Sequence, residues 1–373
     1  SGALAGIKVL DLSRVLAGPW ATQMLGDFGA EVWKIERPGA GDDTRHWGPP
    51  FVTNADGSQG DAAYFMCANR NKTSIAIDIT SAEGQEQLRT LAQACDVLVE
   101  NFKVGQLQKY GLDYDTLSKL NPKLIYCSIT GFGQTGPYAN RPGYDYLIQA
   151  MGGMMSITGE ADGKPGGGPQ KIGVAMADIV TGLYASNAIL AALHHRDQTG
   201  EGQRIDLSLL DCQLAVLANQ NMNYLIGGKA PKRLGNAHPN IVPYQVFATS
   251  DDAIIIAVGN DGQFARLAAL LGHSDWAQDA RFATNEARVN HRETLVPMIQ
   301  ALLSEKRARE WLELLEANGI PCGPVNTIEQ AFANPQIQHR EMQRELTRED
   351  GTKIPTVANP IRLSKTPVEY HTA

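Results

Sequence analysis

The first 130 residues alternate apolar runs with segments of helical length, and this alternation restricts the possible folds most strongly. Short apolar runs suited to buried strands occur at residues 7–12, 31–36, 73–79, 96–101 and 124–129. Strands separated by connections of this length favour parallel pairing through right-handed crossovers. The pattern therefore predicts an α/β fold, with a doubly wound, Rossmann-like parallel sheet.

The amino-acid composition changes after residue 228, where a stretch rich in Pro, Asn and Gly begins. Residues 242–260 predict a β-hairpin turned at residues 250–252. Helices are expected at residues 18–28, 144–155, 261–271 and 293–318. A chain of 373 residues is long enough for two domains. We expect a large α/β domain at 1–227, a smaller α+β domain at 228–325 and a segment at 326–373 that returns to the large domain.

Asp178 is the only charged side chain between residues 172 and 193, which form a long apolar segment. A carboxylate removed from water without a partner is unfavourable by several kcal/mol, or it takes up a proton. Such a residue is a candidate nucleophile or general base. An equally good interpretation places Asp178 near a helix start, where it caps free N–H groups. A membrane span fits poorly, because polar residues interrupt the segment and no other approaches span length.

The overall charge and the cysteines narrow the class of protein. The net charge is −7, so no basic field indicates a nucleic-acid partner or a membrane surface. The five cysteines are scattered and odd in number, which favours a reducing compartment over a disulfide framework. His194 and His195 are adjacent, so no metal site is expected. We expect a cytoplasmic enzyme, or a mitochondrial matrix one if the source is eukaryotic and a leader was removed.

Common catalytic motifs are missing, but charged and aromatic residues follow several predicted strands. The sequence has no G-x-G-x-x-G after the first strand, no Walker A motif and no G-x-S-x-G, which weakens the dehydrogenase, NTPase and hydrolase interpretations. Ligands of open α/β sheets bind where the strands end. At these ends, Arg37 and Lys103 could each meet a phosphate and Phe102 could stack on a base.

A series of ordered motifs carries a family resemblance. They are LSRVLAGPWATQ, KIERPGAGDDTR, DVLVENF, YCSITGFGQTGP, GYDYLIQAMGG, ADIVTGLYA and TGEGQRIDLSLLD. With them the chain resembles the class III CoA-transferase (CaiB–BaiF) family essentially from end to end. The resemblance implies that Asp178 is the nucleophile and that the enzyme is an interlocked homodimer. It also implies that acyl-CoA and a small carboxylic acid are the substrates, with no tightly bound cofactor.

Position by position, the resemblance also implies a binding site. The thiol end of CoA would be lined by Val15, Leu16 and Ala17. The phosphates and nucleotide would be held by Arg37, Lys109, Ile77, Thr80, Asn101, Phe102 and Lys103. The acyl group or acceptor acid would face Tyr64, Tyr144 and Asp145. The distal carboxylate of a diacid needs a cation, for which Arg45, His46 and His238 are candidates. Backbone N–H groups of residues 131–136 or Asn236 are candidates for stabilising oxyanions.

The resemblance is closest to the branch that handles dicarboxylates, the succinyl-CoA:glutarate or hydroxymethylglutarate CoA-transferases. We therefore expect succinyl-CoA as donor and glutarate, hydroxymethylglutarate, oxalate or itaconate as acceptor. Formyl-CoA transferases have Gln where this chain has Leu16, which weighs against a formyl-CoA/oxalate assignment. A formyl-CoA or acetyl-CoA:oxalate CoA-transferase is kept as an alternative. An α-methylacyl-CoA racemase would carry G-H-D where this chain has Gly143-Tyr144-Asp145. A non-catalytic CoA-binding protein is the alternative outside enzymes.

Overall fold

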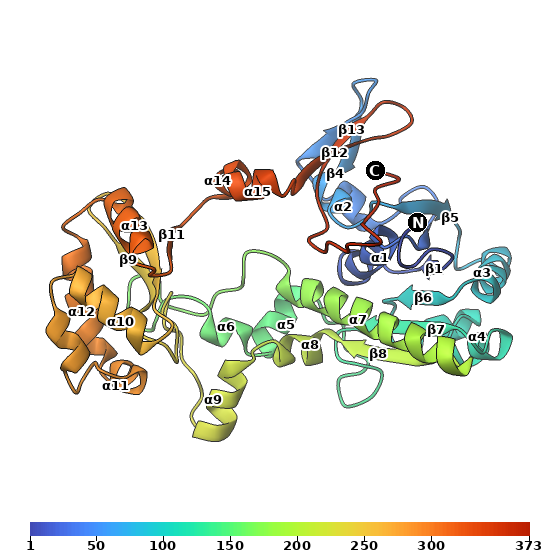
Figure 1. Cartoon of the computed structure of the whole chain (residues 1–373). Coiled ribbons are helices and arrows are strands. Elements are labelled where there is room, and N and C mark those ends of the chain that lie inside the picture. Colours follow the sequence, from blue (N-terminus) through green and yellow to red (C-terminus); the bar gives the residue numbers. More distant parts are fainter. The chain divides into compact units, whose positions relative to one another are not determined.

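The computed structural model describes residues 1–373, and the chain divides into two compact units (Figure 1). Unit 1 comprises Ser1–Met154, Ile172–Ala218 and Asn334–Ala373, and unit 2 comprises Met155–Lys171 and Asn219–Ala333. These limits differ from the expected 1–227, 228–325 and 326–373. The Gly235 N–H donates to the Gly159 carbonyl (3.1 Å) and Arg233 Nε donates to the Glu160 carbonyl (3.1 Å). These bonds attach the loop at Met155–Lys171 to unit 2, which sequence position does not indicate.

Unit 1 is built on a sheet of six parallel strands in the order β5-β2-β1-β6-β7-β8. The strands are β1 (Lys8–Asp11), β2 (Glu31–Glu36), β5 (Lys72–Ala76), β6 (Val97–Glu100), β7 (Ile125–Thr130) and β8 (Arg204–Ser208). The first five overlap the five apolar runs, so the predicted parallel sheet is confirmed. From β1 the chain first builds outward through β2 and β5 and then returns to add β6 on the other side. The strand order therefore reverses between β1 and β6.

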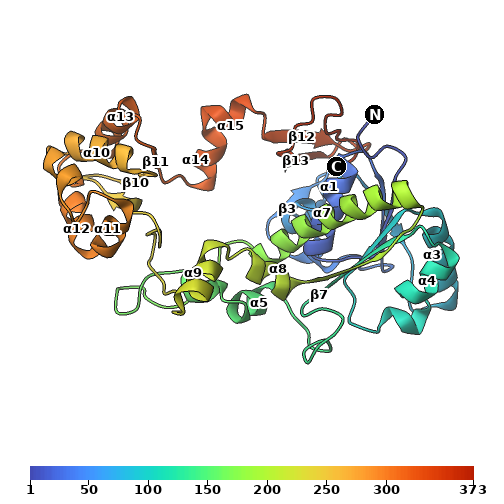
Figure 2. The ribbon, with the colours of Figure 1, turned by 60° about the horizontal axis from the view of Figure 1, so that its bottom comes forward.

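Helices cover both faces of this sheet (Figure 2). On one face lie α1 (Ala17–Asp27) and α7 (Met176–Thr199), and on the other lie α3 (Ala82–Ala94) and α4 (Tyr114–Leu120). Successive strand residues point to opposite faces, so Val9 and Val97 join the core under α1 and α7, while Leu10 and Leu98 join the core under α3.

The remaining elements of unit 1 complete the surroundings of the sheet. They are η1 (Asp43–His46), β3 (Phe51–Thr53), β4 (Gln59–Ala62), α2 (Ala63–Met66), η2 (Leu107–Tyr110), α5 (Asp145–Met151), α8 (Leu209–Ala215), α15 (Pro335–His339), β12 (Gln343–Thr347) and β13 (Lys353–Val357). Buried Asp27 ties the C-terminal segment to the start of the chain, since its carboxylate accepts hydrogen bonds from Arg70 (2.6 Å) and Asn359 (3.0 Å).

Unit 2 packs helices on a small antiparallel sheet in the order β11-β10-β9. Its elements are α9 (Asn219–Gly227), β9 (Tyr244–Ala248), β10 (Ala253–Ala257), α10 (Asp261–Leu270), η3 (Ser274–Gln278), α11 (Asn285–Asn290), α12 (Arg292–Leu303), α13 (Ala308–Ala317), β11 (Cys322–Pro324) and α14 (Ile328–Ala333). The hairpin predicted at residues 242–260 is confirmed by β9 and β10. Arg288 is fully buried in this unit, where it donates to the carbonyls of Val242 (2.8 Å) and Phe282 (2.9 Å).

Two predicted helices are each divided in the structure. Residues 144–155 form α5 and the start of α6 (Met154–Ile157), because the Gly152-Gly153 pair ends the first helix. Residues 293–318 form α12 and α13. Asp251, in the β9–β10 turn, accepts the N–H of Ala308 (2.8 Å) and so caps the start of α13. That cap comes from a residue 57 positions away, which explains why local sequence does not reveal the break.

Helix α7 alone is long and apolar enough, by length and composition, to cross a membrane. Its residues Ala177, Gly182, Ala185 and Ile189 are buried within unit 1, as expected for a central helix of a folded domain.

Candidate active site

The carboxyl ends of the parallel strands bring most of the predicted site residues to one edge of the sheet. Residues 13–17 follow β1 and residues 101–103 follow β6, the two strands between which the strand order reverses. Loops diverge at such a point and leave a crevice for a ligand. Asn101 spans this point, because its amide oxygen accepts the Arg14 N–H (3.1 Å) and its amide nitrogen donates to the Arg14 carbonyl (2.7 Å).

The turn that joins β1 to α1 has an unusual backbone. Val15 has φ = 72°, in the left-handed region that a β-branched residue rarely occupies. Such a conformation is unfavourable by about 1–3 kcal/mol and persists only where surrounding contacts fix it. Leu16 then stands at the N-cap of α1 without a side-chain cap, and Ala17 is the first helical residue. The three residues predicted to line the thiol end of CoA thus form one strained turn.

Asp178 lies in the first turn of α7, close to this strained turn. The helix begins at Met176, and Gly182 lies one turn after Asp178. A Cβ at Gly182 would be 2.7 Å from the Ala17 carbonyl oxygen and 3.1 Å from Trp20 Cβ. Glycine therefore allows α7 to pack closely on the start of α1. Tyr64 lies within electrostatic range of both Asp178 and Asp42, the residue that accepts the Val15 N–H, so the two turns face the same region.

The Asp178 carboxylate is partly buried and accepts no hydrogen bond from the protein. Its backbone N–H donates to Asp145 Oδ1 (3.0 Å), so Asp145 caps the start of α7 from another helix. Burial, and secondarily the negative charge of Asp145, raise the pKa of Asp178 from 3.8 to about 7. Asp178 therefore lies at a helix start, as one interpretation expected, but its carboxylate caps no N–H group and has no hydrogen-bond partner.

The residues predicted to face the acyl group differ in their surroundings. Tyr64 packs edge-on against Trp47 (5.3 Å), and burial together with the nearby charge of Asp178 raises its pKa to about 12. Asp145 also accepts from Gln149 Nε2 (2.8 Å), a buried amide whose oxygen accepts the Ile172 N–H (3.0 Å) just before α7. Tyr144 is 76% exposed at the N-cap of α5. Tyr64 and Asp145 therefore border Asp178, and Gln149 supports the same corner.

The residues predicted to hold the nucleotide flank the β6 end. Phe102 lies under the Arg14 guanidinium (4.5 Å), and its N–H donates to buried Glu100 (2.8 Å). Lys103 and Lys109 are exposed, and neither is paired with an acidic side chain. Both remain available for phosphates.

The β2 and β5 ends carry the other predicted nucleotide contacts. Exposed Arg37 is paired with Asp43 and bonded to the Gly41 carbonyl (3.2 Å). Ile77 is buried, and Thr80 donates through its N–H to Asp78 (2.9 Å). These residues lie at the carboxyl edge of the sheet, as the family resemblance implies.

The three candidates for binding a distal carboxylate differ in the contacts that they already make within the protein. Arg45 donates to both carboxylate oxygens of Glu36 (2.6 and 2.8 Å) and to Asp61 (2.9 Å). All three of its guanidinium nitrogens are therefore already bonded to acidic side chains of the protein. This points to a structural role for Arg45 instead of a substrate contact. His46 Nε2 lies 3.0 Å from the Ala40 carbonyl oxygen. His238 belongs to unit 2, where its carbonyl accepts from Arg292 (3.0 Å).

The structure adds no support for the N–H groups of residues 131–136 or for Asn236 as oxyanion donors. In the loop after β7, the Gly133 N–H already donates to Thr130 Oγ1 (2.9 Å) and the Gln134 N–H donates to Asp206 (3.4 Å). Asn236 belongs to unit 2.

Sequence reasoning missed two buried residues beneath the Val15 turn. Asp42 accepts the Val15 N–H (3.2 Å) and the Lys34 ammonium (2.9 Å), and both side chains are almost wholly buried. A lysine in the middle of the apolar run at residues 31–36 was the available signal, because a buried lysine requires an acidic partner.

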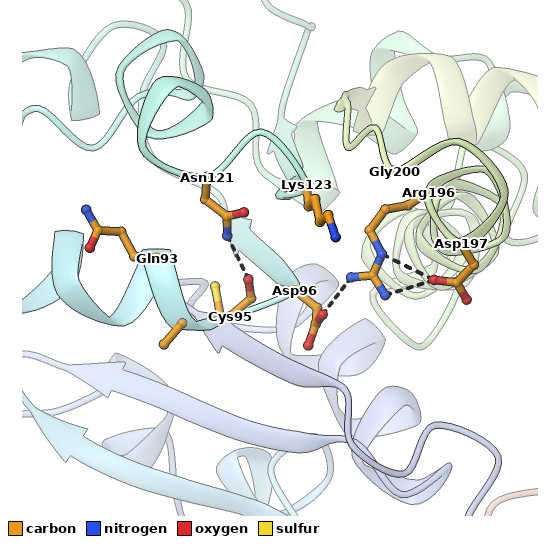
Figure 3. Close-up of a pocket in the computed structure, with 9 residues that line it drawn as sticks. Gln93, Cys95, Asp96, Asn121, Lys123, Arg196, Asp197 and Gly200 are labelled. Atoms are coloured by element: carbon orange, nitrogen blue, oxygen red, sulfur yellow. Dashed lines mark hydrogen bonds and ion pairs between the residues drawn. The ribbon is translucent and has the colours of Figure 1, made fainter.

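A polar pocket of about 460 Å³ lies elsewhere in unit 1 (Figure 3). Asp96 and Lys123 line it just before β6 and β7, and Arg196 and Asp197 line it near the end of α7. It therefore lies at the amino edge of the sheet, away from Asp178. Arg196 is paired there with Asp96 (2.6 Å) and Asp197 (3.0 Å). The pocket does not contribute to the candidate active site.

Comparisons with known proteins agree with this geometry. Residues 4–373 match the model of CoA-transferase family III. The chain is 57% identical over 367 residues to a succinate–glutarate CoA-transferase of Agrobacterium fabrum, covering 98% of this chain and 91% of that one. It is 45% identical to a human succinyl-CoA:glutarate CoA-transferase, covering 97% and 80%.

A solved structure of a CAIB/BAIF family protein from Brucella suis has 51% identity and a TM-score of 0.85, covering 100% of this chain and 95% of that one. A match of this extent covers both units and every motif described above. The chain belongs to CoA-transferase family III and is an enzyme that transfers CoA from a thioester substrate.

Proposed function

We propose that this enzyme moves CoA from succinyl-CoA to glutarate or a closely related dicarboxylate, with Asp178 as the covalent nucleophile. The observation that carries the proposal is an unpaired, partly buried carboxylate beside the turn predicted to hold the thiol end of CoA. The names of the relatives from Agrobacterium fabrum and human support the choice of acids. The relative named acetyl-CoA:oxalate CoA-transferase is less similar, at 38% identity.

The chemistry follows from the reactivity of a carboxylate without hydrogen bonds. Ionised Asp178 attacks the thioester carbonyl of succinyl-CoA, the C–S bond breaks, and a mixed anhydride and CoA thiolate result. The thiolate attacks the aspartyl carbonyl and releases succinate, leaving an aspartyl-CoA thioester. The acceptor carboxylate attacks that thioester, which gives a second anhydride and frees the thiolate again. Attack of the thiolate on the acceptor's acyl carbon yields the new acyl-CoA and restores Asp178.

The decisive experiment removes the carboxylate. Asp178→Ala is expected to abolish transfer from succinyl-CoA to glutarate while CoA binding persists. Asp197→Ala, which removes an exposed carboxylate near the other end of the same helix, is the matched control and should stay active. Wild-type enzyme incubated with succinyl-CoA should form a hydroxylamine-sensitive adduct on Asp178, detectable by mass spectrometry. Comparable turnover by Asp178→Ala would refute the proposed nucleophile.

A panel of acceptor acids tests the substrate separately. Glutarate and hydroxymethylglutarate should be used better than oxalate or monocarboxylates of equal length. A preference for oxalate or for acetyl-CoA as donor would refute the dicarboxylate assignment but leave the role of Asp178 intact.

We also propose that the active form is a homodimer, interlocked as in the family that the chain resembles. The outer face of α7 exposes Leu183, Tyr184 and Leu190, and α9 exposes Leu225 and Ile226. A second copy of the chain would cover these exposed apolar side chains. Sedimentation equilibrium tests the proposal, and a monomer at micromolar concentration would refute it.

A further inference from the structure

Neighbouring side chains hold residues 13, 14 and 15 of the strained turn between β1 and α1. The Val15 N–H donates to Asp42, whose carboxylate is paired with Lys34 (2.9 Å). Asp42 also accepts the Thr44 N–H (3.0 Å), so Lys34 and Thr44 together fix the position of its carboxylate. Burial alone would raise the pKa of Asp42, but the Lys34 charge and the Thr44 bonds hold it below the ordinary value.

The two residues before Val15 are held in the same way. Lys34 Nζ donates to the Ser13 carbonyl (3.0 Å), and Asp11 accepts the Ser13 N–H (2.9 Å). Asn101 forms two hydrogen bonds with the peptide groups of Arg14. The backbone of residues 13–15 is thus held by the side chains of Asp11 in β1, Lys34 in β2 and Asn101 after β6, together with Asp42. This degree of support is what a β-branched residue needs to remain at φ = 72°.

The turn so held is the one that borders the nucleophile. Gly182 of α7 packs directly on the Ala17 carbonyl, one helical turn after Asp178. A shift of the Val15 backbone toward an ordinary conformation would move Ala17 and the start of α1 relative to the carboxylate. Displacements of about 1 Å at a reacting centre can lower rates about 100-fold.

We propose that Asp42, held by Lys34, is a positioning residue that keeps Val15 in the left-handed conformation and thereby aligns the thioester with Asp178. The inference rests on the proposed function of Asp178 as nucleophile. Asp42 itself is buried beneath the turn and acts through the backbone of Val15. Asn101 acts on the same turn from the β6 side. The loop that contains Phe102, which is predicted to flank adenine, is therefore bonded directly to the turn predicted to line the thiol end of CoA.

Two substitutions at one position separate backbone conformation from loss of the side chain. Val15→Gly and Val15→Pro both remove the valine side chain, but glycine adopts φ = 72° readily whereas proline is fixed near −65° and lacks the N–H. The single-turnover rate of acyl-enzyme formation from succinyl-CoA is expected to fall about 100-fold in Val15→Pro. Val15→Gly should react at least about tenfold faster than Val15→Pro. Equal losses in the two variants would overturn the proposal.

A second experiment tests Asp42 and uses glycine as a suppressor. Asp42→Asn should slow acyl-enzyme formation about tenfold or more, and the double variant Asp42→Asn/Val15→Gly should regain most of that loss, because glycine needs no clamp. Rate losses that simply multiply would overturn the proposal. Asp279→Asn, at a partly exposed position in unit 2 where the carboxylate is paired with Arg281, is the control for the chemical change.

Hydrogen exchange distinguishes failure of this inference from failure of the proposed function. The peptide covering residues 12–20 should exchange about tenfold faster in Asp42→Asn than in wild type, whether or not the enzyme is active. Unchanged exchange would overturn the clamp. An inactive wild type with fast exchange in Asp42→Asn would instead refute only the proposed function.

Discussion

Replacing Asp178 by its uncharged isostere should make the protein more stable, by an amount that grows as the pH rises from 3.8 to about 7 and then stays constant. Asp178 has a pKa of about 7 in the folded chain against 3.8 in the unfolded chain. Below pH 3.8 the carboxyl is protonated in both states, so it has no effect on stability. Between pH 3.8 and about 7 only the folded chain keeps the proton, so wild-type stability falls as the pH rises. Asp178→Asn does not titrate and escapes this loss.

The shift in pKa sets the size of the effect. A shift from 3.8 to about 7 corresponds to about 4 kcal/mol at about 1.4 kcal/mol per pH unit. Asp178 is only partly buried, so solvent screening reduces the expected gain to about 2–4 kcal/mol. The entropy of unfolding is about 2.1 cal/mol/K per residue, so Tm should rise by about 3–5 °C at pH 8.

Thermal unfolding of wild type, Asp178→Asn and the control Asp197→Asn at fixed protein concentration measures this difference from pH 4.5 to 8.5. The advantage of Asp178→Asn should be small at the acid end and should level off above neutrality. In wild type, kcat/KM for succinyl-CoA should rise over the same range, because attack requires the ionised carboxylate. A variant that is no more stable than wild type at pH 8, or an advantage that does not change with pH, would refute the reasoning.

Three other substitutions test the surroundings of the site and the core of unit 2. Asp145→Asn removes the charge that helps to raise the pKa of Asp178 but keeps an oxygen for its N–H, so the acid limb of the kcat/KM profile should move to lower pH. Gly182→Ala places a Cβ 2.7 Å from a carbonyl oxygen and should lower stability by about 1–3 kcal/mol in thermal unfolding, whereas Gly227→Ala, with open space around it, should not. Arg288→Lys leaves buried carbonyls of unit 2 without a donor and should destabilise by about 2–4 kcal/mol in urea titration.

Patterns within short stretches of the sequence were sufficient for five strands of the parallel sheet and for singling out Asp178 as a candidate catalytic residue. The apolar run at residues 124–129 overlaps β7, because a strand buried on both faces is largely apolar and can be recognised without distant information. Asp178 could be singled out because it is the one charged group in the apolar segment at residues 172–193. The division of residues 293–318 into α12 and α13 could not be predicted in this way, since Asp251 caps α13 from a distant turn.

The same contrast holds for individual site residues. Arg45 looked available for a carboxylate ligand, yet in the fold Glu36 and Asp61 occupy its guanidinium. Asp42 lies beside exposed Asp43 in the sequence, yet it is buried and paired with Lys34. Whether a charged side chain is already paired within the protein depends on partners that folding brings together. The spacing of residues along the chain does not contain that information.

The amino-acid sequence by itself determined the parallel sheet and the isolated carboxylate, because both arise from periodicity and hydrophobicity within single segments. The tertiary structure alone decided that Val15 is strained, that Lys34 and Asp42 support it, and that Asp145 caps the helix bearing Asp178. These features join residues from different strands and helices. Their energies depend on burial and on distances of about 3 Å, which exist only once the chain has folded.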